Sequence, residues 1–140
     1  MNYQLFLPCL AAYLMMSPAF AAETDKSPLG KQMEAMNSAF KAFRSETDPA
    51  KGAAKAREAQ AAALQSALEV PAMLKSMPDG SDKAKALAEY HRMLGKLYVT
   101  LCEVEVAFLD GKVDEVAKIV GSIKEMKKAG HDRFIEEEEK

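Results

Sequence analysis

The chain has 140 residues, which is room for one domain. Hydrophobic residues make up 49% and charged residues 29%, a balance that excludes a disordered chain and a protein with several membrane spans. The net charge of −2 argues against nucleic acid as a partner, because domains that bind nucleic acid carry a basic excess. Trp is absent, Ala is abundant, and Val, Ile and Thr are sparse, so we expect an all-α fold.

The first 21 residues carry no charged side chain and form an apolar stretch that is broken at Pro18. Ala19-Phe20-Ala21 then has the small-residue pattern that precedes a signal-peptide cleavage point. We therefore expect residues 1–21 to be an export signal cleaved after Ala21, and residues 22–140 to form one domain in the periplasm of a Gram-negative host. The alternative is an uncleaved membrane anchor, although the apolar run is shorter than the ~20 residues that a span requires.

Cleavage after Ala21 removes Cys9 and leaves Cys102 as the single thiol of the mature chain. One thiol excludes an intramolecular disulfide even in an oxidising compartment. We expect no membrane span in the mature chain, and we expect the protein to be a monomer.

Two helices are predicted in the first half of the mature chain. The first begins at Ser27-Pro28, a cap followed by Pro at the first helical position. Its apolar residues recur at spacings of three and four and form one stripe, made of Leu29, Met33, Met36, Phe40 and Phe43. Thr47-Asp48-Pro49 ends this helix and caps the second, which is alanine-rich and passes through Ala53, Ala61, Leu64 and Leu68.

The longest connection follows, because Pro71, Pro78 and Asp79-Gly80-Ser81 interrupt the helical pattern. A third helix is predicted to start near Ser81 and to keep a three-four alternation of apolar residues for three heptads. These residues are Leu87, Tyr90, Leu94, Leu97, Leu101, Val104 and Phe108. Asp110-Gly111-Lys112 then predicts a tight turn.

A fourth helix is predicted to extend to His131 and Phe134 and to fray into Glu136 to Glu139. Its apolar stripe consists of Val113, Val116, Val120 and Ile123. Two of the three connections are short, and short connections join antiparallel neighbours. The sequence therefore predicts an all-α fold, an up-down-up-down antiparallel four-helix bundle.

Met33 and His131 are the residues that this topology brings to one end. An even number of antiparallel helices places the start of the first helix and the end of the last together, and each residue lies about one and a half turns from its end. We expect both side chains to face inward, under the loop from Val70 to Ser81. Two interpretations are open: Met33 fills core space and His131 lies on the surface, or a thioether and an imidazole are the two axial ligands of a haem iron.

Three segments, in this order and spacing, resemble soluble cytochrome b562: LGKQMEAMN at 29–37, DGKVDE at 110–115 and KKAGHDR at 127–133. The resemblance covers nearly the whole mature chain. It implies an exported four-helix protein that binds one b-type haem per chain non-covalently, carries single electrons and catalyses no reaction of its own. It also implies that Met33 and His131 are the axial ligands. The sequence does not identify the redox partner proteins.

Lys127 stands one turn before His131, where the family often has Arg. Because it shares the face of His131, the resemblance implies a contact with a haem propionate, made by a point charge rather than by a bidentate fork. The other interpretation is a solvated lysine on the flank of a helix. Leu94 departs from the family pattern, which has an aromatic residue at that position, whereas Tyr90 keeps the aromatic that lines the haem pocket.

Other ligands and another class of function stay open. Met36 lies one turn from Met33 on the same face and replaces it as the iron ligand if the helix shifts. The sequence lacks C-x-x-C-H and Glu-x-x-His, which excludes c-type haem attachment and a di-iron carboxylate site. The alternative function is a haem-free periplasmic binding module, for copper through Met and His or of the stress type.

Overall fold

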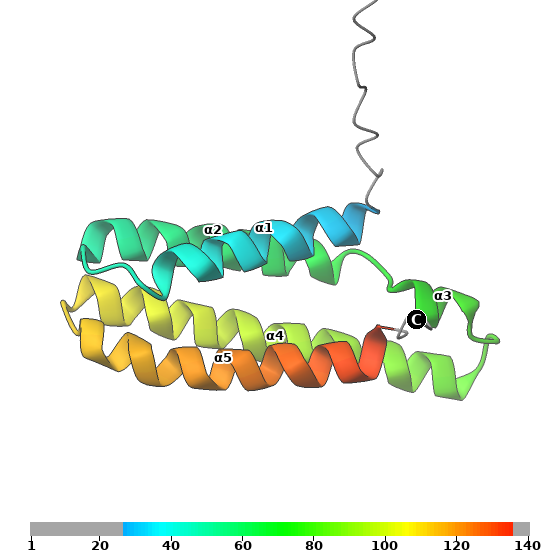
Figure 1. Cartoon of the computed structure of the whole chain (residues 1–140). Helices are drawn as coiled ribbons and strands as arrows, with labels where there is room; N and C mark the ends of the chain where they lie inside the picture. The colour runs from blue at the N-terminus through cyan, green and yellow to red at the C-terminus, as the bar shows by residue number, and fades with distance from the viewer. Residues whose placement is uncertain (1–26, 136–140) are drawn as a thin grey trace, which may run out of the picture.

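The computed structural model describes residues 27–135, which form four long helices and one short helix, without strands (Figure 1). The helices are α1 (Pro28–Phe43), α2 (Pro49–Ala67), α3 (Ala72–Ser76), α4 (Ser81–Leu109) and α5 (Val113–Phe134). The predicted all-α, antiparallel four-helix bundle is confirmed. The predicted signal peptide, its cleavage point at Ala21 and the tail from Glu136 to Glu139 lie outside the described residues. Within the described part, no helix is both long and apolar enough to cross a membrane.

The helices begin and end where the sequence predicted. The Ser27 hydroxyl accepts a hydrogen bond from the N–H of Gly30 at 3.1 Å, and the Asp48 carboxylate accepts one from the N–H of Lys51 at 3.0 Å. Each cap satisfies an N–H group that the first turn of a helix leaves without a partner. Between α4 and α5, Gly111 adopts φ +70°, a conformation that L side chains rarely adopt.

Figure 1 shows two antiparallel pairs, α1 with α2 and α4 with α5, laid against each other. The start of α1, the end of α5 and the short α3 lie at the same end of the bundle. α2 packs extensively against both α1 and α4, α4 packs less against α5, and α1 makes little close contact with α5. The bundle therefore has three well-packed helices and a fourth, α5, that depends mainly on α4.

The main core is built around the small residues of α2. Its buried face consists of Gly52, Ala53, Ala56, Ala59, Gln60, Ala62, Ala63 and Ser66. Large side chains of the neighbouring helices pack against this face, and those of Phe43, Leu101, Val104 and Phe108 are almost completely inaccessible to solvent. Leu64 and Leu68, which the sequence analysis placed along the second helix, are 51% and 76% exposed. They lie outside the core because the alanine stripe already occupies the buried face.

A second, smaller cluster, which we call the end cluster, lies at the α3 end. Its buried residues are Leu74, Ala86, Tyr90, Leu94 and Phe134. Met73 and Met77 pack against it from α3 and its flank, as does Met33 from α1. The prediction that the segment from Val70 to Ser81 closes this end is confirmed, but the segment contains the short helix α3, which was not predicted.

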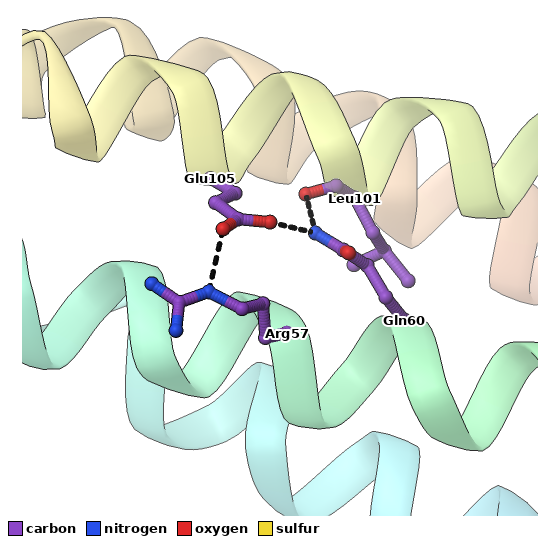
Figure 2. A network of polar contacts seen from close by, with 4 residues as sticks. All are labelled: Arg57, Gln60, Leu101 and Glu105. Carbon is purple, nitrogen blue, oxygen red and sulfur yellow. Dashed lines mark hydrogen bonds and ion pairs between the residues drawn. The ribbon is translucent and has the colours of Figure 1, made fainter.

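One polar network crosses the α2–α4 interface (Figure 2). Glu105 of α4 accepts hydrogen bonds from Arg57 Nε at 2.6 Å and from Gln60 Nε2 at 2.7 Å, and Gln60 also donates to the carbonyl of Leu101. Partial burial raises the pKa of Glu105, but the hydrogen bonds from Gln60 and Arg57 and the Arg57 charge outweigh it, so its pKa is lowered. The network fixes the register of α2 against α4 without leaving a buried polar group unpaired.

Gly52→Ala is expected to lower the free energy of unfolding by about 1–3 kcal/mol, because an added Cβ would overlap the ring of Phe108. The matched control is Gly95→Ala on α4, where nothing lies within 4 Å of the added Cβ. This control is expected to stabilise the helix by up to ~1 kcal/mol. Urea unfolding followed by circular dichroism measures both variants, and a Gly52→Ala protein as stable as wild type contradicts the close α2–α4 packing.

Glu105→Gln is expected to reduce stability at neutral pH by about 1–2 kcal/mol, because it removes the carboxylate that Arg57 and Gln60 contact. Since the pKa of Glu105 is lowered in the folded state, its stabilisation is full above the ordinary carboxyl pKa and is lost as the pH falls through the lowered value. The difference in unfolding free energy between wild type and variant should therefore shrink in acid. Glu58→Gln, in an exposed ion pair with Lys55, is the control and should show little difference at any pH.

Candidate functional site

The site begins at the seam between α1 and α5, the two neighbouring helices that pack least against each other. A groove of about 440 Å³ opens there, within the range of small-molecule sites. Asn37 and Phe40 of α1 form one wall, and Lys127 and His131 of α5 form the other. The seam is therefore the place where side chains of α1 and α5 face each other across a groove, while the two helices make little close contact.

One hydrogen bond crosses this seam and fixes its register. Lys127 Nζ donates to Asn37 Oδ1 at 2.8 Å. Met33 lies four residues before Asn37 on α1, and His131 lies four residues after Lys127 on α5. Because α1 and α5 are antiparallel, both steps lead about 6 Å toward the same end of the bundle. Met33 and His131 therefore lie at the same level on opposite sides of the seam, as the sequence predicted.

Met33 is half-buried and packs against the end cluster. The neighbouring methionine of the same stripe, Met36, packs instead against the main core. The two thioethers therefore belong to different packing environments. Of the two, Met33 is the one that packs against the end cluster, which contains Tyr90 and Phe134.

His131 is exposed and lines the groove, so the prediction that its side chain faces the interior is wrong in this structure. The face of α5 was assigned correctly, because His131 lies about 20° from Val120 around the helix, and Val120 is buried. The difference arises because α1 does not pack over this part of α5. Lys127, on the same face, is exposed for the same reason.

Two aromatic residues of the end cluster form an apolar wall that is buried and does not line the groove. Tyr90 and Phe134 pack edge to face with ring centroids 5.4 Å apart, and both are buried. The Tyr90 hydroxyl donates to the carbonyl of Ser66 at 2.8 Å. Burial, with a contribution from the charge of Glu69, raises the pKa of Tyr90 to about 12. This wall is apolar, and its one hydroxyl, that of Tyr90, already donates its hydrogen bond to Ser66.

The groove is also strongly basic. Besides Lys127, it is lined by Lys41 and Arg44 from α1 and by Lys124 and Lys128 from α5. We call these last four residues the basic strip. All four are exposed, and among the described residues that line the groove only Asp132 is acidic; its carboxylate lies 3.6 Å from Lys128 Nζ.

Asn37 and the basic strip were not predicted from the sequence. Asn37 stands one turn from Met33, and Lys127 one turn from His131, so the helical spacing contained a signal for the bond between them. The basic strip had no such signal, because its residues come from two helices that are distant in the sequence.

Two other residues with reactive side chains lie outside the site. His91 is exposed, and Cys102 is a half-buried free cysteine.

The donor set at the seam fits an iron porphyrin. A thioether and an imidazole at one level are the pair that a six-coordinate haem iron takes. Phe40, which lines the groove, offers apolar surface to the ring, and cations at the mouth suit its carboxylates. Among residues 27–135, no three His, Cys, Asp or Glu side chains gather into a metal-binding cluster.

The fold and the seam together define an antiparallel four-helix bundle with a candidate cofactor site between its first and last helices. The family model described as Cytochrome b562 matches residues 28–134, from the first residue of α1 to the last residue of α5. The chain belongs to the cytochrome b562 family, whose members are haem-binding helical bundles that carry electrons. No curated protein matches the chain.

Proposed function

We propose that this protein is an exported, monomeric b-type cytochrome that binds one haem non-covalently at the α1–α5 seam and exchanges single electrons with redox partner proteins. Met33 and His131 are the axial ligands in this proposal. The observation that supports it most directly is the register at the seam, where the bond between Lys127 and Asn37 brings a thioether and an imidazole to the same level. Membership in the cytochrome b562 family supports the cofactor.

The chain's own residues account for the properties that such a protein needs. A bound haem supplies a one-electron iron couple. His131 and Met33 would hold the haem iron through an imidazole nitrogen and a thioether sulfur, and an iron held by two protein ligands is suited to electron transfer rather than to catalysis. Met33 is a soft ligand that favours the reduced iron. The end cluster, with Leu94 and the pair of Tyr90 and Phe134, keeps water from the inner side.

Lys127 has a second role in this proposal. In the structure, its ammonium group is bound to the neutral amide oxygen of Asn37. A propionate carboxylate is a stronger partner for an ammonium group, because charge-assisted hydrogen bonds are about twice as strong as neutral ones. Lys127 therefore exchanges Asn37 for a propionate when haem is bound, and this exchange releases the bond across the seam.

Met33→Ala and His131→Ala are each expected to abolish the low-spin spectrum and to weaken haem binding on the order of 100-fold, because each removes one iron ligand. Absorption spectra and the pyridine haemochrome assay measure both effects, and wild type should bind one haem per chain. Met36→Ala is the matched control and should keep the wild-type spectrum, since Met36 packs against the main core. Two ligand variants with an unchanged spectrum contradict the assignment, and wild type without haem contradicts the function.

Expression with the complete leader should give a mature protein that begins at Ala22, because Ala19-Phe20-Ala21 has the small residues that signal peptidase requires. N-terminal sequencing and the intact mass of the protein from the periplasmic fraction test this expectation. Ala21→Tyr places a large residue at the cleavage point and should leave the leader attached. Mature protein found only in the cytoplasm contradicts export.

A further inference from the structure

We propose that the basic strip is a docking surface for an acidic protein, which on the proposed function is a redox partner that meets the haem at the seam. The strip consists of Lys41, Arg44, Lys124 and Lys128 on two helices that face each other across the groove. The net charge of the whole chain is −2. Outside the strip, residues 27–135 carry 13 basic and 15 acidic side chains, so the strip is a concentrated positive field on a surface whose charges are otherwise nearly balanced.

Most of the basic strip contributes little to the stability of the fold, although Lys41 lies in the last turn of α1, where a positive charge interacts favourably with the helix dipole. Lys41 and Arg44 are three residues apart on α1, and Lys124 and Lys128 are four residues apart on α5. Like charges at these spacings repel on a helix surface by a few tenths of a kcal/mol. Within residues 27–135, Lys41, Arg44 and Lys124 have no ion-pair partner, and Lys128 has only the exposed Asp132 at 3.6 Å. As far as residues 27–135 are concerned, these charges are therefore available to an external partner.

Most of the strip also lies away from the proposed haem ligands. Lys41 and Arg44 follow Met33 by eight and eleven residues, about 12 and 16 Å along α1. Lys127, one turn from His131, is the residue that we assign to a propionate. The strip therefore extends from the level of the proposed iron ligands along the seam, as an approach surface next to the cofactor.

A second surface hollow differs from the groove at the seam in its charge pattern. The hollow at the α4–α5 turn is lined by two lysines, Lys112 and Lys118, and two acids, Asp114 and Glu115. Lys112 is also paired with Asp110 at 3.1 Å. Mixed charges of this kind create little net field, whereas the strip has one sign along two helices. A field of one sign speeds association with an oppositely charged surface and orients it.

The test uses the full mature protein and labelled poly-L-glutamate as a model of an acidic protein surface, at low ionic strength. The strip variant carries Lys41→Glu, Arg44→Glu and Lys124→Glu. The control variant carries Lys75→Glu, Lys85→Glu and Lys96→Glu, three exposed lysines on α3 and α4, so both variants have the same net charge. Fluorescence anisotropy should show binding that is weakened on the order of tenfold in the strip variant and much less in the control. Equal weakening in both variants overturns the proposal.

Two further measurements test the link to electron transfer and the chemical class of the partner. Oxidation of the reduced haem protein by hexacyanoferrate(III), followed by stopped flow, should be slowed more by the strip variant than by the control, and more strongly at low salt. The haem content of the same samples is measured, so a protein without haem contradicts the proposed function while the anisotropy arm still tests the strip. Binding to phosphatidylglycerol vesicles that is tighter than binding to poly-L-glutamate, and that the strip variant abolishes, overturns the assignment of an acidic protein as the partner.

Discussion

The close packing of α2 against α1 and α4 is the constraint on which the rest of the structure depends. A face of glycine and alanine on α2 admits large side chains from both neighbours, and the ring of Phe108 occupies the space where Gly52 has no Cβ. These three helices form a tight unit because the small face of α2 lets the helix axes approach. α5 has no comparable contact with α1 and rests mainly on α4. The seam between α1 and α5 is therefore a consequence of where the small residues lie.

This asymmetry determines where chemistry can take place. The tight unit buries its aromatic and aliphatic side chains, and its polar groups are paired, as in the network of Arg57, Gln60 and Glu105. At the seam, by contrast, an imidazole, an amide and several ammonium groups face one groove, beside a half-buried thioether. A site for a flat, partly anionic ligand needs an apolar inner wall and a cationic mouth. The seam combines both features, since Phe40 of α1 is apolar and the cations come from α1 and α5.

The sequence predicted the fold to a large extent because local signals determine it. Ser27-Pro28 and Asp48-Pro49 cap the helices that follow them, and the apolar repeat predicted for α4 contains its large buried side chains, Tyr90, Leu94, Leu101, Val104 and Phe108. The same signals place Met33 and His131 at one level. The exposure of His131 could not be predicted, because it depends on how closely α1 approaches α5, and no local pattern encodes that distance. The exposure of Leu64 and Leu68 and the bond between Asn37 and Lys127 depend on tertiary packing in the same way.

The bond between Lys127 and Asn37 also has a consequence for access. It is exposed, and an exposed hydrogen bond between side chains contributes about 1 kcal/mol, only slightly more than thermal energy. Fluctuations at ordinary temperature break such a bond continually, while the α1–α2–α4 unit stays folded. A flat ligand can therefore enter from the side during a short-lived opening of the α1–α5 seam, without unfolding of the bundle. The bond between Lys127 and Asn37 is one of the contacts that such an opening must break, in addition to the packing of α1 and α5 side chains into the main core.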